Sequence, residues 1–211
     1  MKKRYIFFVL TCLSFTKVSS EKVLVDFYGD LTNDKVAERV IVTELDQEGE
    51  FGKIRLLQIF TKTNNKWVEL ARSTSVIIGS EGGGISGGDP FISESIKINN
   101  GVLEVSHDGG SSWKWFVTHK FRFQKNKFEL IGFKHNYGKP CEYFQEVDYN
   151  LTTGKIIFEK EFETCENGDQ IKSKDENEVF VKKLQPLPNF QTINVKEIKI
   201  VSPKYKNEIY L

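Results

Sequence analysis

The chain is poor in three residue types: its 211 residues include three cysteines, one methionine and five prolines. It also has no excess of charge, because 30 Lys and Arg stand against 29 Asp and Glu, a formal net charge of +1. A protein dedicated to nucleic acid needs a basic face, so this balance argues against that class. Beyond the first 20 residues, no apolar run is long enough to cross a bilayer as a helix.

Aromatic and branched residues are what the chain does have. Hydrophobic residues make up 39% and aromatics 13%, with 17 Phe among them. A disordered chain could not carry so much apolar surface. Phe, Tyr, Val and Ile favour strands, so this composition predicts a β-rich globular protein.

The first 20 residues are predicted to be a secretory signal rather than part of the fold. A basic start at 2–4 precedes a mostly apolar stretch at 5–15, and Val18 and Ser20 fit the small-residue positions before a cleavage site. The apolar stretch is too short for a membrane-spanning helix. A lipid-modified Cys12 is the alternative, disfavoured because Thr11 is a poor residue before a lipidated cysteine.

Cleavage after Ser20 would remove four basic residues and leave 26 basic against 29 acidic, a net charge of −3. The mature chain, 21–211, is then a mildly acidic single domain in the periplasm or outside the cell. This charge argues against nucleic acid or an anionic membrane as partner. We expect a monomer with no transmembrane segment, whose partner is a protein or a glycan.

Short apolar runs separated by Gly and Asn turns recur along this mature chain and predict strands. Their spacing favours an all-β fold, an antiparallel meander of hairpins that forms a sandwich or blade-like sheets. A complete propeller is excluded, because blades of about 40–50 residues would fit at most four times. The expected strands are 23–28, 36–44, 54–61, 66–72, 92–98, 102–107, 113–124, 127–134, 142–150 and 155–163, with weaker runs at 178–184 and 193–201.

The run 113–124 alternates aromatic and mostly basic residues, as a strand with two different faces does. A two-residue turn at 125–126 predicts a hairpin with 127–134, in which aromatic residues and opposite charges face each other. The predicted pairs are Phe123 with Phe128, Arg122 with Glu129 and Phe121 with Leu130.

A second hairpin, 142–150 with 155–163, predicts the cysteine pairing. A three-residue loop ending at Gly154 gives pairs whose numbers sum to 306. The predicted pairs are Glu146 with Lys160, Phe144 with Phe162, and Cys141 with Cys165. Facing strand ends can supply disulfide geometry, and export permits the bond, so we expect a Cys141–Cys165 disulfide. The polar stretch 166–178 that follows is expected to be a loop.

The segment 29–38 is a candidate Ca²⁺ site, because oxygen ligands recur in it at alternate positions before an apolar strand. The candidate ligands are Asp30, Thr32, Asp34, the Val36 carbonyl and Glu38. Lys35 stands where such loops usually have glycine and brings a positive charge beside the ion, so binding is expected to be weak. An acidic turn entering a strand is the alternative interpretation.

Several segments together resemble a family of small exported proteins of Bacteroidetes-type bacteria whose start is similar to FG-GAP/VCBS repeats. They are GDLTNDKVAERVIV at 29–42, GGDPFISESIKINNGVLEVSHDGGSSWKWFVTHKFRF at 87–123, FELIGF at 128–133 and DYNLTTGKI at 148–156. The similarity spans about residues 23–160. The resemblance implies an exported β protein with no assigned enzymatic activity.

Trp113 and Trp115 share one face of their strand and are a candidate ligand platform for sugar rings, with core packing as the alternative. Other residues could serve catalysis, but their arrangement is weak. The three histidines lack zinc-like spacing, and the cluster His107, Asp108, Ser111 and Ser112 is too compact for a triad. The acids that could form a glycosidase pair are Asp89, Glu94, Glu104 and Asp108.

The sequence therefore favours a non-catalytic extracytoplasmic binding or structural module, not an enzyme, with Ca²⁺ as the one cofactor considered. The alternatives are a secreted glycan-active hydrolase and a carbohydrate-binding module.

Overall fold

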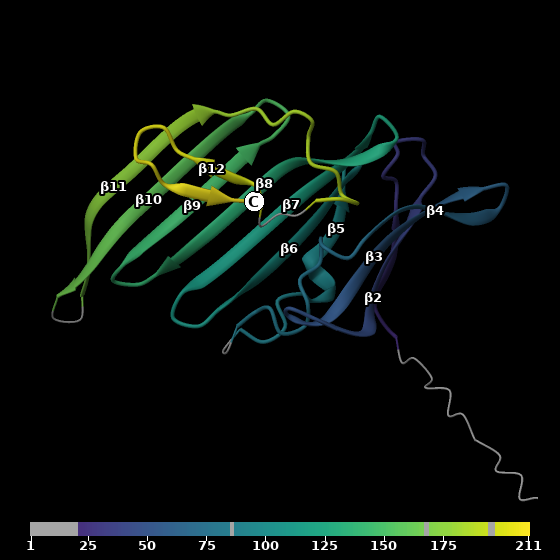
Figure 1. Cartoon of the computed structure of the whole chain (residues 1–211), viewed down its shortest axis with the longest axis horizontal. Coiled ribbons are helices and arrows are strands. Elements are labelled where there is room, and N and C mark those ends of the chain that lie inside the picture. The colour runs from purple at the N-terminus through teal and green to yellow at the C-terminus, as the bar shows by residue number, and fades with distance from the viewer. Residues whose placement is uncertain (1–20, 85–86, 167–168, 194–196) are drawn as a thin grey trace, which may run out of the picture.

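The computed structural model describes residues 21–84, 87–166, 169–193 and 197–211. The predicted signal segment, with Cys12, lies outside these residues. The predicted all-β class is confirmed: antiparallel strands joined by hairpins form three sheets, and within the described residues they form neither a closed barrel nor a propeller (Figure 1). No helix of the described residues is long and apolar enough to cross a membrane.

The two large sheets are simple meanders, in which each strand pairs with its neighbour in sequence. The four-stranded sheet contains β1 (Lys22–Gly29), β2 (Glu38–Gly49), β3 (Gly52–Thr63) and β4 (Lys66–Ser73). A 3-10 turn, η1 (Ser93–Ser95), leads into the seven-stranded sheet of β5 (Ile96–Asn99), β6 (Val102–Gly110), β7 (Lys114–Gln124), β8 (Lys127–Lys139), β9 (Tyr143–Asn150), β10 (Lys155–Glu166) and β11 (Asp169–Val181). A small third sheet pairs β12 (Lys199–Val201) with β13 (Glu208–Tyr210).

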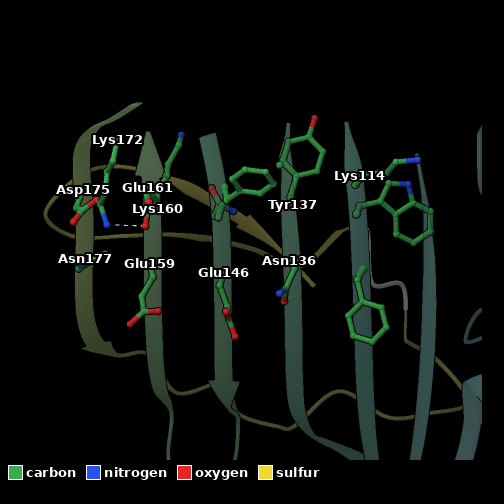
Figure 2. A pocket seen from close by; sticks show the side chains of 15 residues that line it. Lys114, Asn136, Tyr137, Glu146, Glu159, Lys160, Glu161, Lys172, Asp175 and Asn177 are labelled. Carbon is green, nitrogen blue, oxygen red and sulfur yellow. Dashed lines mark hydrogen bonds and ion pairs between the residues drawn. The ribbon is translucent and has the colours of Figure 1, made fainter. Parts of the chain in front are cut away.

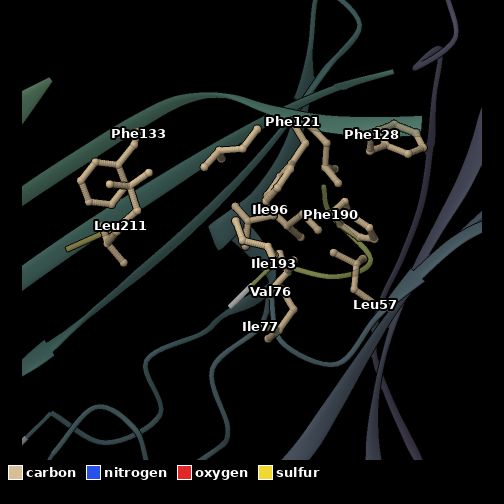
Figure 3. Packing of buried hydrophobic residues seen from close by; sticks show 14 of the residues in the cluster. Leu57, Val76, Ile77, Ile96, Phe121, Phe128, Phe133, Phe190, Ile193 and Leu211 are labelled. Carbon is tan, nitrogen blue, oxygen red and sulfur yellow. The ribbon is translucent and has the colours of Figure 1, made fainter. Parts of the chain in front are cut away.

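One hydrophobic cluster joins the two large sheets and the C-terminal segment. Leu57 of β3 and Phe121 of β7 are both fully buried in it (Figure 3). Phe190, from the segment after β11, packs edge-on against Phe121 with ring centroids 5.2 Å apart. The C-terminal segment therefore completes the core, although its sequence predicts only a weak strand at 193–201.

The β7–β8 hairpin has the predicted register near its turn, where Phe123 faces Phe128 and Phe121 faces Leu130. Farther from the turn a bulge shifts the pairing by one, so that His119 faces Phe133. Because side chains alternate between faces, the extra residue in β8 (Ile131) reverses which of its later side chains point inward. Phe133, which follows the bulge, is therefore buried.

The second hairpin corrects the predicted register by one residue. Its loop has four residues, 151–154, because Gly154 adopts φ +83° and its N–H donates to the Asn150 carbonyl at 2.8 Å. Paired numbers therefore sum to 305, and the predicted pairs of Glu146 with Lys160 and Phe144 with Phe162 are wrong. Instead Glu146 faces Glu159, Gln145 faces Lys160, Phe144 faces Glu161 and Tyr143 faces Phe162.

The Cys141–Cys165 disulfide is nevertheless present, with a Cα–Cα distance of 5.1 Å. Cys141 precedes β9 and has φ +68°, so it lies outside the regular ladder. The Glu163 N–H donates to the Glu142 carbonyl at 3.0 Å beside it. This irregular end of the hairpin absorbs the one-residue difference and brings the sulfurs together.

The expectation of a loop at 166–178 is wrong, because β11 covers most of that stretch and forms 12 residue pairs with β10, with one register shift between Phe162 and Glu163. Its side chains are mostly exposed, so the strand has little apolar alternation to reveal it in the sequence. Salt bridges take the place of apolar contacts along this strand: Lys172 Nζ lies 2.7 Å from Glu161 Oε2 and 3.3 Å from Asp175 Oδ1. The strand is the edge of the sheet.

Candidate functional site

A cavity of about 810 Å³ lies between the two large sheets and is the strongest candidate for a binding site. One wall comes from the inner face of β7 and β8, and the opposite wall from the β2–β3 hairpin end and the segment 74–82. Most of its wall is apolar. Its lining side chains include Phe51, Arg55, Ile78, Trp115, Val117, His119, Phe133, His135 and Leu211, together with the charged side chains of Glu50, Lys53 and Glu197.

The three histidines of the chain meet on the inner face of neighbouring strands. Val117 of β7 pairs with His107 of β6 on one side and with His135 of β8 on the other. His119 lies two residues along β7 from Val117, on the same face, diagonally adjacent to both histidines. His135 is on this face because of the β8 bulge. The sequence spacing alone did not reveal this convergence.

Burial keeps these imidazoles neutral. Desolvation lowers the pKa of His107 to about 3 and that of His119 to about 4, with nearby positive charge a smaller cause. Desolvation also lowers the pKa of the less buried His135. The Ile78 N–H donates to His107 Nε2 at 3.2 Å, so the neutral ring carries its proton on Nδ1.

Two polar atoms of the cavity-lining residues lack partners. His119 Nε2 and Arg55 Nε are buried, and neither has a hydrogen-bond partner among the described residues. The other nitrogens of Arg55 are well paired: its guanidinium binds the Asp89 carboxylate with two nitrogens and the Glu44 carboxylate at 3.2 Å. Burial would raise the pKa of Asp89, but Arg55 and the Phe91 N–H hold it below its usual value.

An apolar cavity with a few polar atoms is the usual form of a small-molecule site. Its volume falls in the range of about 300–1,000 Å³ typical of such sites. The neutral histidines can donate or accept a hydrogen bond at neutral pH. Asp89, the nearest carboxylate of the predicted glycosidase set, is committed to Arg55. This arrangement suits binding rather than proton transfer.

The candidate calcium loop joins β1 to β2, and its acids bind its own backbone. The Glu38 carboxylate is buried and accepts from the N–H groups of Leu31 at 2.8 Å and Thr32 at 3.1 Å. Asp30 accepts from the Lys35 N–H at 3.0 Å, and Asp34 from the Val36 N–H at 2.8 Å. These contacts support the acidic-turn interpretation. No group of three or more His, Cys, Asp and Glu among the described residues is placed to hold a metal, and Ca²⁺ binding stays a prediction.

The two candidate platform tryptophans have different surroundings, and both are only partly exposed. Trp113 stacks on Tyr137, with ring centroids 5.1 Å apart, and lies just before β7. Trp115 packs against the core and lines the inter-sheet cavity. Its ring covers Gly109, where a Cβ would come within 2.6 Å of it. Trp115 therefore belongs to the cavity wall.

The outer face of β7–β11 carries a second hollow, a shallow groove of about 510 Å³ (Figure 2). Phe116 and Phe144 line it and are 43% and 44% exposed. The Phe144 ring lies over β8 because Gly138 has no side chain there; a Cβ at that position would come within 2.4 Å of the ring. Glu146 and Glu159 face each other in this groove, and neither forms a salt bridge among the described residues.

The remaining acids of the predicted glycosidase set have separate surroundings, and within the described residues no hydrogen bond or salt bridge joins them to one another. Glu104 forms salt bridges with Lys97 at 3.5 Å and Lys120 at 3.1 Å. Glu94 is in η1, and Asp108 is exposed in β6, opposite Phe116. The strand predicted at 102–107 instead continues to Gly110. The facing pair Glu146 and Glu159 was missed, because the predicted register placed a lysine opposite Glu146.

No family model matches this chain, and no curated protein matches it significantly. The case for a function therefore rests on the geometry of the cavity and the groove.

Proposed function

We propose that the protein is a non-catalytic, extracytoplasmic binding module that holds a small, mostly apolar molecule between its two sheets. The cavity of about 810 Å³ carries this proposal. Burying apolar ligand surface against its walls would supply most of the affinity, at about 25 cal/mol per Å². The disulfide supports an oxidising compartment, which agrees with the signal segment predicted at 1–20.

Naphthalene binding tests the cavity directly. We expect the mature chain, 21–211, to bind naphthalene, and Val117→Phe to abolish binding because the larger side chain enters the cavity from β7. Val179→Phe is the matched control, since Val179 is 63% exposed on β11, away from the cavity. Thermal melts show whether both variants are folded. Equal binding by both folded variants would refute the proposed location.

Export has its own test. Expression of the full chain in a secreting bacterial host should yield a protein that begins at Glu21, as read by intact mass. A lipid adduct on Cys12 would support the lipoprotein alternative instead, and retention of the full-length chain would contradict both.

The exposed rings of the outer groove favour a second candidate function, carbohydrate binding. Sugar rings stack on aromatic faces, and the carboxylates of Glu146 and Glu159 could accept hydrogen bonds from hydroxyl groups. Phe116→Ala and Phe144→Ala should each reduce retardation in gels that contain a soluble β-glucan or xylan. Tyr28→Ala is the control, because Tyr28 is 56% exposed on the other sheet. No retardation of the unmodified protein would remove this candidate for those glycans.

A further inference from the structure

The groove on the outer face of the seven-stranded sheet is crossed by a straight row of side chains (Figure 2). Each member of this outer row lies directly opposite the next one on the neighbouring strand, and all are exposed. Neighbouring strands are about 4.8 Å apart, so the row presents one group per strand to a chain laid across the sheet. From β6 to β11 the outer row consists of Asp108, Phe116, Asn136, Glu146, Glu159 and Asn177.

Phenyl rings and amides in the groove suit a sugar chain. Phe116 belongs to the outer row, and Phe144 lies two residues along β9 from Glu146, on the same face. Both rings line the groove and are close to half exposed. The amides of Asn136 and Asn177 can each donate and accept hydrogen bonds. Sugar rings can therefore stack on the phenyl groups while their hydroxyls bond to the amides.

The charge of the outer row decides which sugar chain fits. The carboxylates of Asp108, Glu146 and Glu159 form no salt bridge among the described residues. Glu146 and Glu159 also face each other across neighbouring strands, and like charges placed directly opposite one another are destabilising. A cation bound between these two carboxylates would remove that repulsion.

Two of the lysines near the outer row are paired with other acids. Lys172 binds Glu161 and Asp175 on the β10–β11 side of the groove. Lys134 lies 2.9 Å from Asp148 Oδ2. Its pKa is raised mainly by Asp148, and Glu146 is a smaller cause. Neither lysine therefore neutralises the facing glutamates.

The other two lysines that line the groove do not neutralise them either. Side chains alternate along β10, so Lys160 points to the face opposite that of Glu159, where its Nζ lies 3.9 Å from the centroid of the Tyr143 ring. Lys114 is on the groove's face, at the start of β7, and its Nζ lies 3.4 Å from the Gly110 carbonyl oxygen. Even with Lys114 counted against them, the three carboxylates of the outer row leave an excess of negative charge.

We infer that the groove binds a linear amino sugar polymer whose rings stack on Phe116 and Phe144 and whose ammonium groups bind Glu146 and Glu159. This inference rests on the second candidate function, carbohydrate binding, and does not involve the inter-sheet cavity. It adds the class of glycan, a hexosamine chain with free amino groups, and names the two carboxylates that select it.

Three hexamers with the same β-1,4 linkage isolate the effect of charge: cellohexaose, the N-acetylglucosamine hexamer and the glucosamine hexamer. They differ only in the group at C2, which is a hydroxyl, an acetamide or an amine. Calorimetric titration is done at mildly acidic pH, where the amines are protonated. We expect the glucosamine hexamer to bind about ten-fold more tightly than either neutral hexamer, which two exposed ion pairs can supply. Added salt should reduce this preference by screening the pairs.

A double substitution then assigns the preference to the facing carboxylates. Glu146→Gln/Glu159→Gln keeps the size and hydrogen bonding of both side chains, so it should keep binding of the neutral hexamers and reduce the preference to about two-fold or less. Glu48→Gln/Glu94→Gln is the matched control. It removes two exposed carboxylates outside the groove, one in β2 and one in η1, and should keep the full preference. Thermal melts show whether both variants are folded.

The outcomes separate this inference from the candidate function on which it rests. Equal binding of the three hexamers, or a preference that Glu146→Gln/Glu159→Gln leaves unchanged or that the control reduces equally, would overturn the inference and leave carbohydrate binding standing. Tighter binding of spermine, which has ammonium groups but no sugar rings, would overturn the amino sugar as ligand. Failure of all three hexamers to bind would overturn the carbohydrate-binding candidate as well.

Discussion

Arg55 and Asp89 form a two-pronged salt bridge in which the Arg55 side chain is fully buried and the Asp89 side chain is 44% exposed. Arg55 belongs to β3, and Asp89 lies in the segment that leads from the four-stranded to the seven-stranded sheet. The bond therefore fixes that crossing segment against the first sheet, and Ile78 adds to it by accepting from Arg55 at 3.3 Å through its carbonyl.

Removing the Asp89 charge should destabilise the protein. Asp89→Asn leaves the buried Arg55 with Glu44 as its one remaining carboxylate, and we expect a loss of about 2–3 kcal/mol. Urea unfolding measures this loss. Asp26→Asn, which removes the partner of the more exposed Arg39, should cost less than about 1 kcal/mol. Equal losses would show that burial of Arg55 adds nothing.

Acidification should destabilise the fold through its histidines. The pKa of His119 is about 4 in the folded protein and 6.5 in the unfolded chain, so below pH 6.5 protons bind preferentially to the unfolded chain. Stability should therefore fall as pH drops from about 6.5 to 4, by about 3 kcal/mol for His119 alone. Urea unfolding at several pH values gives the free energy of unfolding as a function of pH. This free energy should change less steeply with pH in His119→Gln than in the unmodified protein. An identical pH dependence would contradict the role assigned to His119.

Opening the disulfide should have a large effect. The bridge closes a loop with a sequence separation of 24, for which chain entropy predicts about 3 kcal/mol. Cys141→Ser/Cys165→Ser should lose about this much stability in urea unfolding. Reduction of the unmodified protein converts the disulfide to two thiols and should add the mass of two hydrogen atoms, and the double variant should show no such change. A protein whose mass is unaffected by reduction would contradict the bond.

Calcium should stabilise the protein if the β1–β2 loop binds it. A ligand at 100 times its Kd adds about 2.7 kcal/mol, so melts in millimolar Ca²⁺ and in chelator should differ if Kd is well below this concentration. Asp34→Asn keeps an oxygen that can accept from the Val36 N–H but removes the charge, and it should abolish the response. Identical melts for the unmodified protein would remove the Ca²⁺ prediction.

Local sequence patterns predicted most of the strands, but they did not predict everywhere which side chains face the core. The paired aromatics Phe123 and Phe128 were enough to fix the register beside a two-residue turn. The register beyond Leu130 depends on the β8 bulge, where an extra residue carries no distinctive sequence signal. The turn before Lys155 was predicted to have three residues but has four. The resulting one-residue error in register hid the fact that the carboxylates of Glu146 and Glu159 face each other.

The cavity could not be predicted because it depends on how two sheets pack. Its walls come from segments more than 50 residues apart, such as Phe51 and His119. The convergence of the three histidines depends on the full lengths of β6 and β8 and on the β8 bulge. The strands predicted at 102–107, 113–124 and 127–134 did not include that bulge, so they did not predict the convergence. β11 was missed because an edge strand exposed on both faces needs no apolar alternation.

The edge strand β11 also bears on how the protein behaves when it is concentrated. In the described residues it pairs on one side with β10, so its outer backbone groups remain open to another strand. Between Lys172 and Glu178 five of seven side chains are charged. Copies stacked in register along this edge would bring like charges directly opposite one another. The strand that closes the sheet thus also discourages the growth of fibrils from it.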